Sequence, residues 1–145
     1  MVNMNNDLDN KLCEKYPLIF ADRHKPKTES VMFWGFECGD GWYNIIDAMC
    51  AIIQGHINFQ NNKRRIYLEK NYEDIPDHVP QVVAVQVKEK FGSLRFYYDG
   101  GDDYINGVVN MAVIMSEKTC MECGSPGTMR TDGWWHVACE EHYDE

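Results

Sequence analysis

The chain has 145 residues, the size of one ordinary domain, and is long enough to bury a hydrophobic core without disulfide bonds. Apolar residues make up 44% of it and aromatic residues 12%, which excludes a disordered protein and predicts folding nearly throughout. The formal net charge of -9 would repel a nucleic-acid backbone unless the 14 lysines and arginines cluster on one face. General nucleic-acid binding is therefore disfavoured.

Six cysteines are present, and the N-terminal residues are polar. No apolar run approaches the roughly 18 residues that a membrane-spanning helix needs. We therefore expect no secretory signal, no membrane contact and a cytoplasmic location. In a reducing cytosol, cysteines at metal-ligand spacing indicate a metal site, and the others, Cys13, Cys38 and Cys50, are expected to be free thiols.

The first part of the chain predicts one short helix followed by a loop. Apolar residues recur every four positions over residues 7–16, and Pro17 interrupts the pattern. Residues 18–20 are apolar and are expected to pack inward. Residues 21–30 are polar, include a proline and show no periodicity, so we expect an exposed loop there.

A glycine-rich turn precedes the longest helical pattern. Asp40 lies between two glycines, where its carboxylate is suited to be the N-cap of the helix that follows. From Trp42 onward, apolar residues recur at intervals of three and four, which predicts a central amphipathic helix that ends near residues 55–58. After it we expect a basic turn at residues 61–65 and a short strand at residues 66–68.

Residues 82–98 predict an antiparallel hairpin, which is reached through an irregular segment at residues 69–80. Its first half is rich in β-branched residues and its second half in aromatic residues, and Phe91-Gly92 supplies the turn. Alternation along a strand would place three valines of the first half on one face: Val83, Val85 and Val87.

A second amphipathic helix is predicted over residues 104–118. Asp102 or Asp103 is suited to be its N-cap, and apolar residues recur at helical spacing behind them. This helix delivers the chain directly into Cys120.

The C-terminal tail contains the spacing that most directly predicts chemistry. Cys120 and Cys123 form one Cys-x-x-Cys hook, and Cys139 and His142 form a Cys-x-x-His hook fifteen residues later. Three thiolates and one imidazole can close a tetrahedral Zn²⁺ site. His136 is the alternative fourth ligand. With four protein ligands the site is closed and structural, whereas water in place of the histidine would leave it open to hydrolytic chemistry.

The segment between the two hooks predicts a small hairpin. Thr131-Asp-Gly133 is typical of its turn, and Trp134 and Trp135 are expected to cover the metal site. We expect residues 119–145 to form a zinc-binding module packed on an α+β core at residues 1–118, as one compact domain.

Other motifs give weaker indications of chemistry. Cys38 could be a nucleophile, but no histidine can be assigned to it as a base, and a buried thiol beside a helix cap is the simpler interpretation. Asp77 followed by Gln86-x-Lys88 resembles the acid and x-Lys pair of some metal-dependent nucleases, although a glutamine stands where a carboxylate is usual. Asp99, Asp102 and Asp103 could bind a hard cation, although capping of the next helix is a simpler explanation for these acidic residues.

Three blocks of sequence, taken together, resemble a family of small proteins encoded by bacteriophages and prophages. The blocks are residues 36–42 (FECGDGW), residues 86–98 (QVKEKFGSLRFYY), and the Cys-x-x-Cys-Gly-Ser-Pro-Gly run with Trp134 and the Cys-x-x-His hook. The similarity runs over most of residues 16–142. It implies a phage origin and expression in a bacterial cytoplasm, and it brings no catalytic residues with it.

The sequence therefore predicts an α+β fold with about three helices, a small antiparallel sheet built on the 82–98 hairpin, and a C-terminal zinc knuckle or ribbon. Because no set of catalytic residues stands out, we expect a phage-type interaction protein that binds and inhibits a host protein, such as a defence or nucleic-acid-processing factor. Five residues are candidate contacts with that partner: Asp99, Asp102, Asp103, Trp134 and Trp135.

Two other function classes remain open at this stage. A nucleic-acid-binding zinc protein would use basic residues as phosphate contacts, and the candidates are Lys63, Arg64, Arg65, Lys88, Lys90, Arg95 and Arg130. A metal-dependent hydrolase would use Asp77 and Lys88, or an open zinc site.

Overall fold

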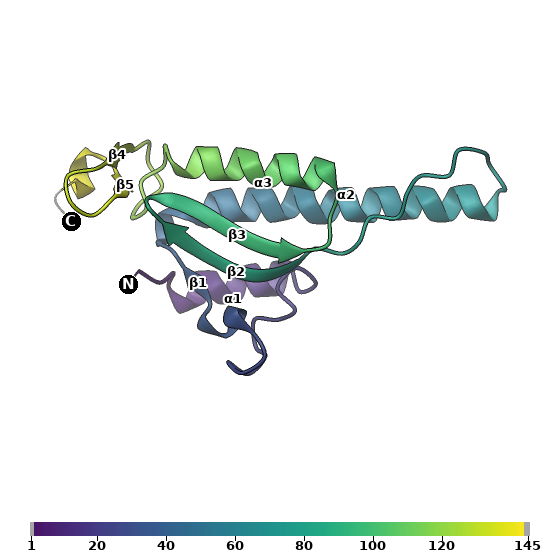
Figure 1. Ribbon diagram of the computed structural model, residues 1–145, viewed down its shortest axis with the longest axis horizontal. Helices are drawn as coiled ribbons and strands as arrows, with labels where there is room; N and C mark the ends of the chain where they lie inside the picture. The colour runs from purple at the N-terminus through teal and green to yellow at the C-terminus, as the bar shows by residue number, and fades with distance from the viewer. Residues whose placement is uncertain (1, 144–145) are drawn as a thin grey trace.

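The computed structural model describes residues 2–143 and has an α+β fold (Figure 1). Three strands form the main sheet in the order β1 (Phe36–Glu37), β2 (Val83–Lys90) and β3 (Ser93–Asp99). The β2–β3 pair is the expected antiparallel hairpin, whereas β1 pairs with β2 in parallel, so the sheet is mixed. A second sheet, of two short antiparallel strands, lies in the C-terminal tail: β4 (Thr128–Arg130) and β5 (His136–Ala138).

Three α-helices accompany the sheets: α1 (Asn6–Lys15), α2 (Tyr43–Glu69) and α3 (Asp103–Ser116). Helices α2 and α3 pack against each other, and in the view of Figure 1 the strands lie between α3 and α1. Short 3-10 helices occur at Val31–Trp34, Asp40–Trp42 and Glu140–His142. The core between these layers is formed by fully buried side chains that include Leu12, Phe36, Trp42, Ile46, Ile53, Leu94 and Ile105.

Helix α2 is longer than the sequence predicts, and the expected turn at 61–65 and strand at 66–68 are wrong. The last fully covered residue of its buried face is Ile57, and the helix then continues away from the core to Glu69 (Figure 1). The returning chain supports this extension, because the Asn61 side chain exchanges two hydrogen bonds with the backbone of Val79, at 2.8 and 2.9 Å. Helical structure here is stabilised by that loop and not by an apolar stripe.

Asp40 does not cap α2 as expected. Its carboxylate instead accepts hydrogen bonds from the backbone and side-chain nitrogens of Asn5, at 2.8 and 2.9 Å. Asn5 is itself the N-cap of α1, and accepts from the backbone N–H of Leu8. Asp40 therefore ties the start of α1 to the turn that precedes α2.

Two smaller expectations are also corrected by packing. A register shift between Ala84 and Gln86 interrupts the alternation in β2, so Ala84 and Val87 are buried while Val83 and Val85 are only half-buried. Leu18 is 56% exposed, although its neighbours Ile19 and Phe20 pack inward as expected.

Helix α3 agrees with the helix that the sequence predicts over residues 104–118. Asp102 is its N-cap and accepts a hydrogen bond from the backbone N–H of Ile105 at 3.1 Å. Among residues 2–143, no helix combines the length and the apolarity needed to cross a membrane.

Candidate metal centre

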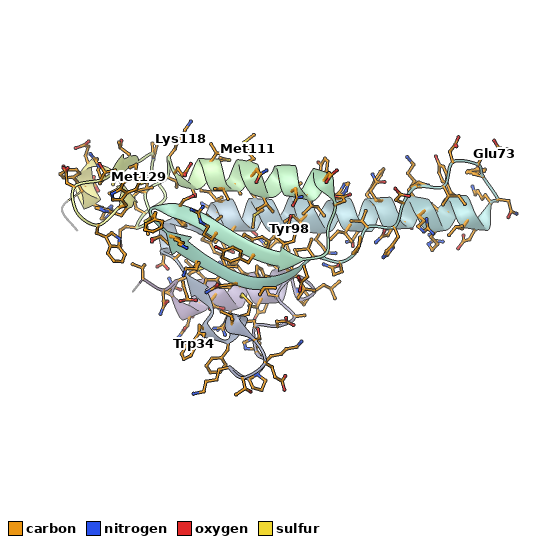
Figure 2. All side chains as sticks on the ribbon, viewed as in Figure 1. Trp34, Glu73, Tyr98, Met111, Lys118 and Met129 are labelled. Carbon is orange, nitrogen blue, oxygen red and sulfur yellow. The ribbon has the colours of Figure 1, made fainter. Side chains whose placement is uncertain are left out.

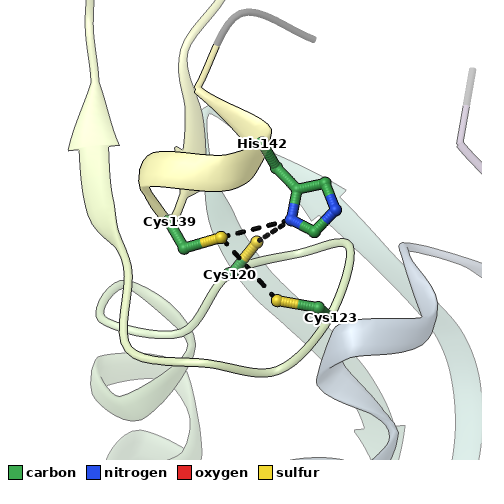
Figure 3. Close-up of side chains that lie close together, drawn as sticks. All are labelled: Cys120, Cys123, Cys139 and His142. Carbon is green, nitrogen blue, oxygen red and sulfur yellow. Dashed lines mark hydrogen bonds between the residues drawn. The ribbon is translucent and has the colours of Figure 1, made fainter.

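The four residues of the two C-terminal hooks meet at one point. The Sγ atoms of Cys120, Cys123 and Cys139 and a ring nitrogen of His142 all lie within 4.8 Å of one another. Figure 3 shows the four side chains pointing toward a common centre, with His142 on the short helix at Glu140–His142 and Cys139 directly before it. The donor set is therefore three sulfurs and one nitrogen, all contributed by the chain.

The spacing of these atoms fits a tetrahedral ion. Two sulfurs bound at about 2.3 Å to one tetrahedral ion lie about 3.8 Å apart, and a sulfur and an imidazole nitrogen lie about 3.6 Å apart. The Sγ atoms of Cys123 and Cys139 are separated by 3.8 Å. The Nδ1 atom of His142 is 3.6 Å from the sulfur of Cys120 and 3.2 Å from that of Cys139. The four residues can hold a metal ion without rearrangement of the backbone.

The first hook is shaped by local backbone structure. The N–H of Gly124 donates to the carbonyl of Cys120 at 3.0 Å, and the N–H of Cys120 donates to the carbonyl of Ser125 at 2.7 Å. Gly124 has a φ of +81°, a conformation that glycine adopts without strain. This tight turn aims both thiols of the hook at the same point.

Hydrogen bonds at the first hook favour its thiolates, the form that binds metal. Contacts with Ser125 lower the pKa of the Cys123 thiol to about 6. Partial burial acts to raise the pKa of Cys120, but backbone N–H groups, that of Cys139 foremost, outweigh it and lower that pKa. Cys123 therefore offers a negatively charged sulfur to a cation near neutral pH.

His136, the alternative ligand, does not face the site. Its Nδ1 atom lies 2.8 Å from the carbonyl oxygen of Trp134, and its Nε2 atom is buried without a hydrogen-bond partner among the described residues. His142 occupies the fourth position instead. No position in the cluster is left for water when all four residues bind one ion.

The metal-ligating hook rests directly on the glycine-rich turn before α2. The N–H of Gly41 donates to the carbonyl of Met121 at 2.9 Å. A Cβ at Gly41 would lie 2.1 Å from the carbonyl oxygen of Cys120, and one at Gly39 would lie 2.1 Å from that of Met121. Both glycines are therefore required because two backbone segments approach closely here. The sequence did not predict this contact between distant segments. The signal was the Gly-Asp-Gly run itself, which predicts a tight turn and a helix cap but not this contact.

The two tryptophans of the tail do not cover the metal site as expected. Trp134 is 69% exposed and Trp135 is 50% exposed. They line a separate hollow with Phe91, at the turn of the β2–β3 hairpin. They therefore belong to the surface that the metal-binding tail presents.

The acidic candidates are not gathered into one site. Asp102 caps α3, and its carboxylate also lies 2.8 Å from the Nε2 atom of His56. Asp99 ends β3 and Asp103 begins α3. Within residues 2–143, the C-terminal cluster alone gathers three or more histidine, cysteine or acidic side chains closely enough to hold a metal.

The basic candidates fall into three separate groups. Lys63, Arg64 and Arg65 lie on the extended part of α2, where Arg64 donates to the carbonyl of Pro76 and Arg65 pairs with Glu69. Three more lie on the hairpin, where Lys88 stands directly opposite Arg95: Lys88, Lys90 and Arg95. Arg130, in the tail, bonds the carbonyl of Ala138 and the carboxylate of Glu140.

The remaining catalytic candidates are also separated. Asp77 is exposed in the loop that returns along the end of α2, whereas Lys88 lies in the second half of β2. Cys38 is buried, and burial raises the pKa of its thiol to about 12, so it is protonated at neutral pH and unsuited to nucleophilic attack.

No protein-family model, no curated protein and no solved structure matches the chain significantly.

Proposed function

We propose that the chain is a zinc-binding interaction protein of the bacteriophage type, which binds a protein of its bacterial host and inhibits it. Three thiolates and one imidazole are a common donor set of structural zinc sites. The observation that carries the proposal is that all four ligands come from the chain, so that the ion has no open position for substrate or water. The metal then shapes a surface and does not perform a reaction.

The surface beside the metal supports an interaction role. Trp134 and Trp135 are exposed in the segment between the two hooks, and tryptophan is one of the residue types enriched among the energetically important residues of interfaces. A second apolar surface, a groove of about 620 Å³ between α2 and α3, includes the exposed side chains of Ile52, Tyr104, Met111 and Met115. Apolar surface of this kind is typical of proteins that bind other macromolecules.

The experiment is an affinity purification from bacterial lysate with the zinc-loaded full chain as bait. We expect a host protein to be recovered at stoichiometric amounts, and its activity to fall when the purified chain is added. The matched control is the chain with Trp134 and Trp135 both replaced by alanine, which keeps all four metal ligands. Absence of any specific partner, together with measurable turnover of nucleotides or nucleic acid by the chain alone, would overturn the proposal.

The two competing functions are tested in the same preparation. A nucleic-acid-binding protein would give a complex in a gel shift at low salt that weakens steeply as salt is added. A metal-dependent hydrolase would release product from DNA, RNA or nucleotides in Mg²⁺ or Mn²⁺. The separation of the basic residues into three groups, and of Asp77 from Lys88, favours neither.

A further inference from the structure

A hollow with aromatic walls lies between the β2–β3 turn and the C-terminal tail. Its volume is about 720 Å³, and three of its lining residues are Phe91, Trp134 and Trp135. These side chains are 65%, 69% and 50% exposed, so three large rings face solvent around one space. The remaining lining residues are Glu89, Lys90 and Gly133.

Phe91 is held at this place by an unfavourable backbone conformation. Its φ is +55°, and with Gly92 at +77° it forms the two-residue turn of the hairpin. Asparagine, aspartate and glycine are the residues that adopt such a conformation readily, and a bulky side chain there is unusual. The ring stays exposed despite this strain, so it is free to contact a ligand.

Glu89 contributes a carboxylate that lacks a complete set of hydrogen bonds. It lies opposite Leu94, on the side of the hairpin that faces the core, and partial burial raises the pKa of its carboxyl group. Its Oε2 atom is shielded from solvent and has no hydrogen-bond partner within residues 2–143. A shielded acceptor without a donor costs free energy, so this oxygen is poised to accept a donor from outside the chain.

The metal-binding tail holds the two halves of the hollow together. A Cβ at Gly92 would lie 2.4 Å from the sulfur of Met129 and 3.5 Å from the Cα of His136, so β4 and β5 pack tightly on the hairpin turn. Figure 2 shows Met129 beside the end of the β2–β3 hairpin. The segment between β4 and β5 carries both tryptophans, so its position relative to Phe91 depends on the folded tail.

We propose that this hollow binds the arginine side chain of a basic segment in a partner protein, with the guanidinium against the aromatic rings and Glu89 as its hydrogen-bond acceptor. This inference rests on the proposed role as an interaction protein and names the chemistry of its partner. The faces of aromatic rings attract cations, and the planar guanidinium stacks on them and is weakly hydrated. Its N–H groups supply the donor that Glu89 lacks.

Charge on the chain favours the same occupant. The Nζ atom of Lys90 lies 5.7 Å from the centroid of the Phe91 ring, so an incoming guanidinium must take the place of this ammonium over the ring. The net charge of -9 attracts a basic partner at long range. A second copy of the chain is a poorer occupant, because two chains of this charge repel each other.

Trp134 is the ring best placed to report arginine binding. It lines the hollow and also a second, smaller one of about 120 Å³ that includes Glu89, Glu37 and Lys88. Trp134 thus lines both spaces beside Glu89. Binding of a guanidinium against this ring changes the indole N–H resonance of Trp134.

The test is an NMR titration of the zinc-loaded chain with acetylated arginine amide, followed at the indole N–H signals of the four tryptophans. We expect saturable shifts at Trp134 and Trp135 and none at Trp34 or Trp42. The amide of citrulline, which has nearly the same shape without the charge, should shift these signals little. Lysine amide should bind more weakly than arginine amide, because its ammonium is more strongly hydrated.

Two variants locate the binding energy. Glu89→Gln removes the charged acceptor and should weaken arginine binding by about tenfold or more. Phe91→Asn suits the backbone of the turn, so the variant should fold at least as stably as the parent while losing affinity. Trp34→Ala is the matched control, because Trp34 is 58% exposed but lies in the N-terminal part of the chain, far from Met129 in Figure 2.

Equal shifts with citrulline amide, absence of saturation, or full affinity in Phe91→Asn would each overturn the inference. The titration needs no host protein, so it fails or succeeds independently of the proposed function. If the lysate purification still recovers a partner while the titration fails, the interaction role stands and this hollow is not its site.

Discussion

The indole Nε1 of Trp42 donates a hydrogen bond to the backbone carbonyl of Thr119 at 3.0 Å. Trp42 is fully buried at the start of α2, and Thr119 immediately precedes the first metal ligand. Residues 77 positions apart thus join the core to the metal-binding tail. The tail is positioned by the core, and not only by the ion.

Replacing Trp42 with phenylalanine should destabilise the chain. The indole N–H is lost and the Thr119 carbonyl is left without its donor, which costs about 1–3 kcal/mol in addition to any loss of packing. The measurement is urea unfolding of the zinc-loaded protein. Trp34→Phe is the control, and because Trp34 is exposed it should change the free energy of unfolding by less than about 0.5 kcal/mol.

Replacing Gly41 with alanine should weaken metal binding and lower stability. The new Cβ would lie 2.1 Å from the Cys120 carbonyl oxygen and 2.7 Å from the Gly124 nitrogen, both backbone atoms that cannot simply turn aside. The hook must therefore shift away from the turn. Gly55→Ala is the matched control, because a Cβ there meets nothing within 4 Å, and it should stabilise α2 by up to about 1 kcal/mol. Equal stability of the two variants would contradict the contact.

Replacing His142 with alanine should remove a metal ligand, whereas His136→Ala should keep the metal. Loss of a residue that only hydrogen-bonds a metal ligand lowers metal affinity by about 10–100-fold. Loss of the ligand itself in the His142 variant should lower zinc affinity by more than this. The measurement is competition with a coloured zinc chelator, with metal content of the purified proteins as a check. A stoichiometric ion in the His142 variant with unchanged affinity would argue against the four-ligand site.

The buried ion pair between Asp9 and Arg23 is expected to be important for stability. The Nε atom of Arg23 donates to Oδ1 of Asp9, and its Nη2 atom donates to Oδ2, each at 3.0 Å. Its Nη1 atom donates to the carbonyl of Phe33 at 2.9 Å. The Asp9 side chain is only 6% exposed. Asp9→Asn leaves the guanidinium of Arg23, whose side chain is 18% exposed, without its counter-ion and should cost about 3 kcal/mol in unfolding experiments. The double variant Asp9→Leu with Arg23→Met should recover part of that loss, and a larger loss in the double variant would contradict this account.

Stability should depend on pH through Asp47, which joins α1 to α2. Its Oδ1 atom accepts from the hydroxyl of Tyr16 at 2.6 Å and from Nζ of Lys15 at 2.7 Å. Partial burial acts to raise the pKa of Asp47, but these hydrogen bonds outweigh it and lower the pKa below its usual value. The stabilisation is therefore fully present above the unfolded pKa near 3.9 and is lost as the pH falls through the lower folded value.

Asp47→Asn tests this linkage. The variant should be less stable than the parent at neutral pH, and the difference should shrink as the solution is acidified below about pH 4. Urea unfolding across this pH range measures it. A difference that stays constant with pH would mean that the carboxylate charge is not involved.

Local patterns in the sequence predicted the parts of the fold that short-range forces decide. The helix at Asp103–Ser116, its Asp102 cap and the hairpin turn at Phe91-Gly92 follow from periodicity and turn chemistry. The meeting of the two C-terminal hooks was also predicted, because Cys-x-x-Cys and Cys-x-x-His spacing places donors on tight turns whatever the rest of the chain does.

By itself, then, the sequence determined the α+β class, the hairpin and the three cysteine donors, while the structure decided for His142 over His136 as the fourth. Only the tertiary structure decided how far α2 extends, that β1 joins the sheet in parallel, that Asp40 binds Asn5, and that Gly41 admits the backbone of the hook. It also decided that Trp134 and Trp135 line a hollow with Phe91. Each of these depends on a contact between distant segments, whose backbone atoms and rings carry no periodic signal along the chain.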